Sequence, residues 1–535
     1  MSRIQTGLAG MPVYRGGMGV PVEGALPPRP PFAAGVVLAL AALKLALHVA
    51  VNLRTPYGVH RDELLYMAVG ERLRLWSMDF PPLIALVSLL GRGLFGDSLV
   101  AIRLVPALAG AGLLVLSAAI ARELGGGRRA QALAALAVLA GPLFLRSASL
   151  FQPVVLDQLW WTLGLLALAV LCRTGSPRAW IGFGVACGLG LLTKFSILFF
   201  GLAVLGAVLA TPHRRALRAP WPWAALVTTL LLGAPSLVGQ VRLGFPVSGQ
   251  MSDLQESQLA RVGPAEFVLG QPQLLGPGIL LALLGAVALL ASPRMRPFRL
   301  VGLSCVLAFA LLLALRGKPY YIGPIYPALL AAGAVQLERV PGRIAGPAAG
   351  WGAAAGMVAF ALVILPLGVP VLAPARMAAY TERLGLAEAN RTNTGELERL
   401  PQDYADMLGW PEQAAAVARV FHALPPEKRA RAVVLAGNYG EAGALDFYGP
   451  RLGLPPAVSP AGSYWFFGPG ELPGEVLVTL GLPEEELRPL FREVKAAARV
   501  ANPWGVEEER DVPVLVAEGP RRTLQEVWPG LAGRN

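Results

Sequence analysis

Cysteine and charge are both scarce in this chain. Only three cysteines occur among the 535 residues, Cys172, Cys187 and Cys305, and all of them lie in or beside apolar runs. A disulfide framework and a cysteine metal site are therefore excluded. Charged residues make up 15% of the chain and hydrophobic ones 55%, which is far too apolar for an ordinary soluble enzyme. The composition predicts a polytopic membrane protein.

Three common sequence signals are also missing. No P-loop pattern of the type GxxxxGK[ST] occurs, so nothing predicts a nucleotide-phosphate site. Outside the apolar part no basic run interleaves with aromatics, which argues against nucleic acid as a partner. No signal-peptide cleavage pattern precedes the first apolar run, and residues 1–30 are expected to form a flexible cytoplasmic tail.

The charge that is present divides the chain in two. Residues 1–374 carry 29 Lys and Arg against 12 Asp and Glu, whereas residues 375–535 carry 17 against 22. A basic membrane domain over 31–375 and a mildly acidic soluble domain over 376–535 are predicted. The basic excess indicates topology and contact with anionic membrane lipid or phosphate.

About eleven apolar segments are candidates for transmembrane helices. They lie near residues 31–53, 99–120, 130–145, 159–171, 179–192, 196–210, 221–238, 274–290, 300–315, 322–335 and 350–371.

The basic residues give these segments an orientation. If the N-terminus is cytoplasmic, every short connection on the inner side is basic, as the positive-inside rule requires. The residues concerned are Arg122, Arg128, Arg129, Arg173, Arg178, Arg214, Arg215, Arg218, Arg294, Arg296, Arg299, Arg339 and Arg343. Most acids fall on the other side, and an odd number of crossings puts the soluble domain there too. A multi-pass protein of the cytoplasmic (inner) membrane with its C-terminal domain outside is expected.

The first outer loop concentrates acids directly after a membrane-spanning run. Asp62 and Glu63 are adjacent in it, and Asp79 precedes a pair of prolines. Carboxylates at a membrane face can accept a proton from a hydroxyl or bind a metal. The alternative is that a hydrated loop is simply charged.

Further candidates lie at the outer ends of other segments. Arg103 and Asp157 open two apolar runs, and such charges indicate either function or a structural ion pair. Lys194 occupies a tight outer turn, where an interfacial anchor is the alternative. Two aromatic rings, Tyr320 and Tyr321, follow Lys318. These cations and rings suit a lipid-borne phosphate, and equally an ordinary interfacial belt.

The C-terminal part alternates helical and strand patterns. An amphipathic helix is predicted over 410–424, and buried strands over 432–436 and 476–480, so an α/β layered domain is expected. Its run 437–470 contains several polar and aromatic residues that either bind a carbohydrate or pack in a core. They are Asn438, Tyr439, Glu441, Tyr464, Trp465 and Phe466.

The order of motifs resembles a known family. The motifs are HRDELLYMAVGERL, MDFPPLIALVSLLGRGLFGDSLVAIRLVPALAGA, LDQLWW, GLLTKFSIL and KPYYIGPIYPAL. In this order they resemble bacterial glycosyltransferase family 39 proteins, which are related to protein O-mannosyltransferases and lipid A aminoarabinose transferases. The resemblance covers about residues 35–335 and implies a GT-C fold.

The family implies an inverting transfer of a sugar from a polyprenyl-phosphate donor to a glycan, lipid or protein acceptor outside the cytoplasmic membrane. Its catalytic acids fall on Asp62, the expected base, and on Glu63 and Asp157. Its acid before the proline pair falls on Asp79 and its cation after the FG turn on Arg103, and both are expected to bind substrate. The family often has His or Lys where this chain has Phe80, which weakens the inference of phosphate or metal binding there.

The chemistry of such a transfer agrees with these residues. Polyprenyl phosphate is a good leaving group, so a base for the acceptor and cations for the phosphate are needed. Arg61, Arg103 and Lys318 are candidates for the cations. A divalent cation held by carboxylates is an open alternative to them.

Two other functions compete with a transferase. A secondary transporter or lipid flippase also explains many helices with charges, but predicts internal repeats and binding groups near the membrane midplane. A non-catalytic sugar-binding envelope protein would keep the aromatic run of the soluble domain without needing Asp62.

Overall fold

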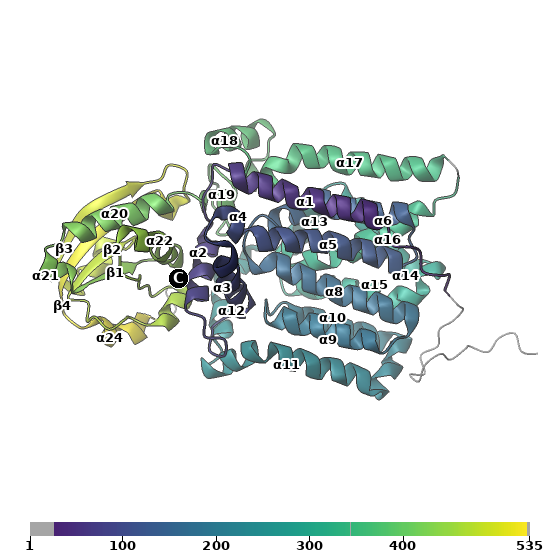
Figure 1. The fold of residues 1–535 in the computed structure, drawn as a ribbon, viewed down its shortest axis with the longest axis horizontal. Helices are drawn as coiled ribbons and strands as arrows, with labels where there is room; N and C mark the ends of the chain where they lie inside the picture. The colour runs from purple at the N-terminus through teal and green to yellow at the C-terminus, as the bar shows by residue number, and fades with distance from the viewer. Residues whose placement is uncertain (1–25, 343, 532–535) are drawn as a thin grey trace, which may run out of the picture.

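A computed structural model describes residues 26–342 and 344–531. It has a bundle of roughly parallel helices with an α/β domain at one end of the bundle (Figure 1). The predicted tail over residues 1–30 lies almost entirely outside the described part of the chain.

Helices account for the N-terminal two thirds of the chain. They are α1 (Ala34–Arg54), α2 (Arg61–Glu71), α3 (Leu83–Phe95), α4 (Leu99–Ile102), α5 (Leu104–Glu123), α6 (Arg128–Ala140), α7 (Pro142–Ser147), α8 (Pro153–Thr174), α9 (Arg178–Leu191), α10 (Ile197–Ala210), α11 (Pro220–Arg242), α12 (Pro246–Ser257), α13 (Pro264–Leu275), α14 (Gly278–Ala291), α15 (Arg299–Ala314), α16 (Tyr326–Glu338) and α17 (Ala345–Gly368).

Every predicted apolar segment coincides at least partly with one of these helices. In hydrocarbon all backbone polar groups must be satisfied internally, which such runs achieve as helices. Within the described residues, six helices are long and apolar enough to cross a membrane, or up to eight if two bent pairs each count as one span. The multi-pass membrane fold is therefore confirmed, whereas eleven crossings stay a prediction.

Small residues let the helices of the bundle approach closely. A Cβ atom on Gly285 of α14 would lie 1.9 Å from the backbone oxygen of Leu329, and one on Gly333 of α16 would lie 1.9 Å from that of Leu281. Glycine at both positions is thus required for the contact between α14 and α16, a common device of membrane helices.

Arginines from several connections gather at the end of the bundle away from the α/β domain. Arg29 Nη2 lies 2.9 Å from Glu123 Oε2, and Arg173 Nε lies 3.7 Å from the same oxygen. Arg339 Nη2 donates to the carbonyl of Leu124 at 3.3 Å. These connections were predicted to share one membrane face, and the structure brings them together.

The C-terminal part contains the remaining elements. They are α18 (Pro374–Arg383), α19 (Gln402–Ala405), α20 (Trp410–Ala423), α21 (Pro426–Arg429), β1 (Ala432–Ala436), α22 (Tyr439–Tyr448), β2 (Val476–Leu480), α23 (Glu484–Leu487), β3 (Phe491–Ala501), β4 (Asp511–Pro520) and α24 (Leu524–Val527).

The strands form one mixed sheet in the order β1-β2-β4-β3. β1 and β2 are parallel, in register from Ala432 opposite Val476, and β4 is antiparallel to both β2 and β3. Both predicted strands are buried along their whole length. β2 is an interior strand, and β1 is an edge strand whose outer side is covered by the segment around Val458, which pairs with Leu435. The predicted α/β domain is confirmed.

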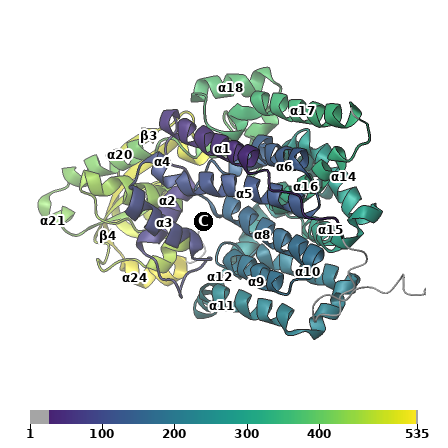
Figure 2. The same cartoon turned by 45° about the vertical axis from the view of Figure 1, so that its right-hand side comes forward.

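The two parts of the chain meet where α2 packs against α22 (Figure 1). Figure 2 shows α2 and α3 beside the α/β domain from another side. A Cβ atom on Gly443 of α22 would lie 2.8 Å from the Cβ of Leu64 and 3.0 Å from its carbonyl carbon. The absence of a side chain at Gly443 therefore sets the distance between the two helices.

We expect Gly443→Val to push α22 away from α2, because the added methyl groups meet backbone as well as side chain. Overpacking of this kind costs about 1–3 kcal/mol, to be measured by thermal unfolding in detergent. Gly530→Val is the matched control, since a Cβ at Gly530 meets nothing within 4 Å. Equal stability of the two variants would contradict the close packing.

Candidate active site

The acidic pair of the first outer loop lies in the first turn of α2. His60 begins this helix with a reciprocal cap. Its Nδ1 accepts a hydrogen bond from the backbone N–H of Asp62 at 3.0 Å, and its own N–H donates to Glu63 Oε2 at 2.8 Å. Capping fixes where the helix starts, and it directs the two adjacent carboxylates to different surroundings.

Asp62 is half-buried, and each of its oxygens accepts one hydrogen bond. The phenol of Tyr439 donates to Oδ1 at 3.0 Å, and the amide of Gln152 donates to Oδ2 at 2.8 Å. These donors come from α22 and from the segment before α8. They hold the carboxylate in one orientation while each oxygen keeps a further lone pair for a proton.

Glu63 is fully buried and binds Arg103, which is also fully buried. Arg103 Nε and Nη2 donate to the two carboxylate oxygens at 2.8 Å each. Glu63 also accepts from the backbone N–H of Phe151 at 2.8 Å. Burial alone raises the pKa of Glu63, but the Arg103 guanidinium and these hydrogen bonds outweigh it and hold that pKa below its usual range.

The remaining donors of Arg103 are also engaged within the protein. Nη2 lies 3.1 Å from the carbonyl of Gly58 and Nη1 lies 3.5 Å from Asn52 Oδ1. All of these contacts are to protein groups, so the catalytic role expected for Glu63 and the substrate-binding role expected for Arg103 stay predictions. The structural ion pair considered for Arg103 is present, but its acid is Glu63 and not Asp157.

A second group of predicted residues lies between α8 and η4 (Pro319–Ile325). Asp157 Oδ2 accepts from the Ser196 hydroxyl at 2.9 Å. The Lys194 ammonium lies 4.5 Å from the centre of the Tyr321 ring and 5.7 Å from that of Tyr320, within the range of cation–π contact. Burial lowers the pKa of Lys194, and the Asp157 carboxylate opposes this shift.

Lys318 joins this group to Asp62. Its ammonium donates to Asn393 Oδ1 at 2.7 Å and also to Gln258 Oε1. Burial lowers the pKa of Lys318 to about 8, with Lys194 acting in the same direction and the Asp62 carboxylate against it. The charges of Asp62 and Lys194 therefore both reach Lys318, which lies between Asp62 and the group around Asp157 in this electrostatic sense.

Asp79 is buried and lies in the segment that connects α2 to α3. Its Oδ2 accepts from the Ser463 hydroxyl at 2.7 Å and from the Gln250 amide at 3.2 Å, and burial raises its pKa. Burial raises the pKa of Tyr66, and the charges of Asp62 and Asp79 raise it further, so the phenol interacts electrostatically with both acids. Asp79 thus ties the first loop to α12 and to the C-terminal domain.

Arg61 faces the C-terminal domain as well. Its guanidinium lies 4.6 Å from the centre of the Tyr439 ring, and Nη1 lies 2.5 Å from Glu508 Oε1. The substrate-binding role predicted for Arg61 stays a prediction, because its contacts in the structure are to protein groups.

The C-terminal domain and its connection to α17 contribute residues that sequence reasoning did not assign to the site. Tyr439, Ser463 and Asn393 donate to or accept from Asp62, Asp79 and Lys318, respectively. Tyr439 was considered as a carbohydrate-binding or a core residue, and not as a partner of Asp62. Tyr464, from the same run, is buried and donates to Asp446 Oδ2 at 2.7 Å, which supports the core alternative for that ring.

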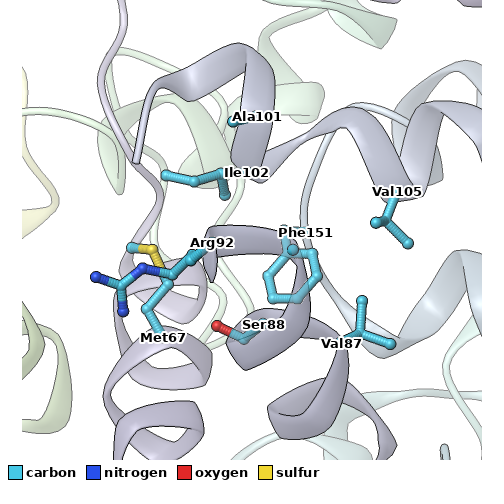
Figure 3. A pocket seen from close by; sticks show the side chains of 9 residues that line it. Met67, Val87, Ser88, Arg92, Ala101, Ile102, Val105 and Phe151 are labelled. Atoms are coloured by element: carbon cyan, nitrogen blue, oxygen red, sulfur yellow. The ribbon is translucent and has the colours of Figure 1, made fainter. Parts of the chain in front are cut away.

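An apolar pocket close to α2 is too small to take a sugar. Met67, Ser88, Ile102 and Phe151 are among its lining residues, and the guanidinium of Arg92 points away from it (Figure 3). Its volume is about 10 Å³, close to the minimum for one water molecule. Among the residues that the structure describes, no group of three His, Cys, Asp or Glu side chains is placed to hold a metal ion.

Comparisons with known proteins agree with this architecture. Residues 79–238 match the family model described as dolichyl-phosphate-mannose-protein mannosyltransferase. No curated protein sequence matches the chain.

Two solved structures share the fold. The crystal structure of ArnT from Cupriavidus metallidurans bound to undecaprenyl phosphate is similar with a TM-score of 0.60 and 18% identity, over 91% of this chain and 100% of that one. The apo state of the same protein gives a TM-score of 0.60 and 20% identity, over 91% and 99% of the two chains. The GT-C fold expected from the motifs is confirmed, and the family match supports a glycosyltransferase of this class.

Proposed function

We propose that this protein transfers a sugar from a polyprenyl-phosphate carrier to an acceptor on the outer side of the cytoplasmic membrane, with inversion at the anomeric carbon. The observation that carries the proposal is the Asp62 carboxylate, which Tyr439 and Gln152 hold in one orientation where the bundle meets the α/β domain. The charges of Asp62 and Lys194 both act on Lys318, which supports two cations near this carboxylate. The similarity to an undecaprenyl-phosphate-bound ArnT structure supports a lipid-linked donor.

The chemistry assigns one role to each kind of group. Asp62 accepts the proton of an acceptor hydroxyl as that oxygen forms its bond to the anomeric carbon. The bond from this carbon to the phosphate oxygen breaks, and the polyprenyl phosphate leaves with the electron pair. Lys318 and Lys194 stabilise the negative charge on that phosphate. Because the leaving group is the polyprenyl phosphate itself, no nucleotide enters the reaction.

The aromatic and buried groups complete this arrangement. Tyr320 and Tyr321 flank the Lys194 ammonium and offer apolar faces to a sugar ring. Asp157 balances the charge of Lys194, and the Glu63–Arg103 pair fixes the first turn of α2 beneath Asp62. The alternative that the carboxylates hold a divalent cation is tested by adding EDTA. If Lys318 and Lys194 suffice for the phosphate, the rate of sugar transfer should not change.

We expect donor use to fall at alkaline pH because Lys318 loses its proton above a pKa of about 8. The value of kcat/KM should decrease about tenfold for each pH unit above that pKa, as for one essential protonated group. Lys318→Arg keeps its charge at these pH values and should move the decrease upward. An unchanged pH profile in Lys318→Arg would remove Lys318 from phosphate binding.

Tyr439→Phe removes one of the two hydrogen bonds to Asp62 and keeps the ring beneath Arg61. The phenol holds the carboxylate in one orientation, and a misplaced catalytic group works less well, so kcat should fall about tenfold while KM for the donor changes little. The control is Tyr448→Phe on the same helix. Full activity of Tyr439→Phe would show that the C-terminal domain does not position the base.

The donor class is tested with purified protein in proteoliposomes and crude cell-envelope acceptor. Radiolabelled polyprenyl-phosphate mannose, glucose and aminoarabinose are supplied one at a time, and the matching nucleotide sugars serve as controls. Label should reach a glycan, lipid or protein acceptor from at least one lipid-linked donor and from no nucleotide sugar. Transfer from nucleotide sugars alone would refute the proposed donor.

A further inference from the structure

A long apolar groove runs along the outside of the bundle between α9, α10 and α11, which lie side by side at its edge (Figures 1 and 2). Its volume is about 580 Å³. Phe183, Leu205 and Leu226 are among the lining residues, and Gly201 of α10 adds no side chain. A groove of this shape facing the bilayer accepts a flexible hydrocarbon chain.

One end of the groove is strongly basic. Leu217 lines the groove and belongs to η1 (Pro212–Arg218), the short 3-10 helix that connects α10 to α11. Arg214 precedes it by three residues and therefore lies on the same side of a 3-10 helix. Arg215 and Arg218 flank it, all three arginines are exposed, and residues 211–219 include no acid.

Two tryptophans mark the depth of this end in the membrane. Trp180 and Trp223 both line the groove, and Trp223 Nε1 donates to the carbonyl of Leu217 at 2.9 Å. Tryptophan is enriched where hydrocarbon meets headgroups. Along its length the groove is first apolar, then lined by the two tryptophan rings, and then followed by the arginines. A phospholipid has the matching order of acyl chain, interfacial ester groups and phosphate.

We propose that the groove binds one anionic phospholipid from the leaflet at this end, with an acyl chain between α9, α10 and α11 and the phosphate on Arg214, Arg215 and Arg218. This site is separate from the proposed sugar-transfer site. Ser196, which contacts Asp157, directly precedes α10, whereas η1 follows the other end of that helix. A carrier whose phosphate is held by Lys318 cannot also place it on η1.

The test is native mass spectrometry of the full chain in detergent, titrated with phosphatidylglycerol or phosphatidylcholine. We expect one phosphatidylglycerol to bind at least tenfold more tightly than phosphatidylcholine. The triple variant Arg214→Gln, Arg215→Gln, Arg218→Gln should lose at least tenfold in affinity. The double variant Arg128→Gln, Arg129→Gln, which neutralises exposed arginines of another connection, should change it less than twofold.

A second variant tests the groove itself. A Cβ at Gly201 meets nothing within 4 Å, and the same holds for Gly352 on α17. Gly201→Leu should therefore occupy the groove without strain and reduce lipid binding at least tenfold, whereas Gly352→Leu should not. The proposal would be overturned by equal binding of the two phospholipids, or by unchanged binding in the triple variant or in Gly201→Leu. Displacement of phosphatidylglycerol by one equivalent of undecaprenyl phosphate would also overturn it.

Discussion

Asp62→Asn is expected to lower the rate of sugar transfer by about 10²–10⁴-fold, the usual contribution of a general base. Asparagine keeps the size of the side chain, and its oxygen still accepts from Tyr439 or Gln152. It has no carboxylate to take the acceptor proton. Glu63 and not Asp62 accepts the hydrogen bond from the N-cap residue His60 and binds Arg103, so the substitution should leave the fold and donor affinity intact.

The measurement is initial transfer rate with donor affinity determined separately. Asp97→Asn is the matched control, since Asp97 lies in the same outer region and its Oδ1 is 2.5 Å from Arg92 Nε at the surface. It should retain more than half of the wild-type rate. A rate for Asp62→Asn equal to that of Asp97→Asn would mean that the base lies elsewhere.

The second large effect is expected from Arg103→Met. The change leaves the Glu63 carboxylate buried without its cation, and removal of one partner of a buried ion pair costs about 3–5 kcal/mol. The thermal unfolding temperature in detergent should fall accordingly. Transfer activity should fall with it, because the first turn of α2 carries Asp62.

Arg391→Met provides the control for this effect. Arg391 pairs with Glu388 at 2.8 Å, but both side chains are exposed, and exposed pairs contribute only about 0–1 kcal/mol. A small stability loss for Arg103→Met, together with a large loss of donor affinity, would contradict the positioning role. It would return Arg103 to the substrate-binding role predicted from its motif.

The helical part of the fold was predictable because hydrocarbon enforces helices on long apolar runs. The buried strands β1 and β2 were equally clear, since each is a short apolar run. β3 was not detected because, unlike the buried edge strand β1, it has many exposed residues, such as Arg492, Glu493 and Lys495. Exposed edge strands lack the alternation that marks a half-buried one.

The site was only partly predictable for a different reason. Adjacent acids and outer-end cations identified Asp62, Asp157, Lys194 and Lys318 as candidates, since such charges are costly near a membrane unless used. The contact of Asp62 with Tyr439 spans 377 positions of sequence. No local pattern reports a contact at that range.

The Glu63–Arg103 pair shows the same limit within the membrane domain. Arg103 was recognised as an unusual charge, and an ion pair to an acid was considered for it. Its partner depends on how the first turn of α2 is capped, which a backbone hydrogen bond from His60 decides. The sequence thus identified the charged candidates, but it did not show which of them contact substrate and which hold another residue in place.

The measurement that tests the central proposal most directly is the stoichiometry of donor breakdown in proteoliposomes. A donor labelled with one isotope in its sugar and another in its polyprenyl phosphate is supplied with envelope acceptor. We expect one free polyprenyl phosphate for each sugar found on the acceptor, and Asp62→Asn should form both products more slowly by the same factor. Movement of the intact sugar-linked lipid across the bilayer without release of polyprenyl phosphate would contradict a transferase and indicate a flippase.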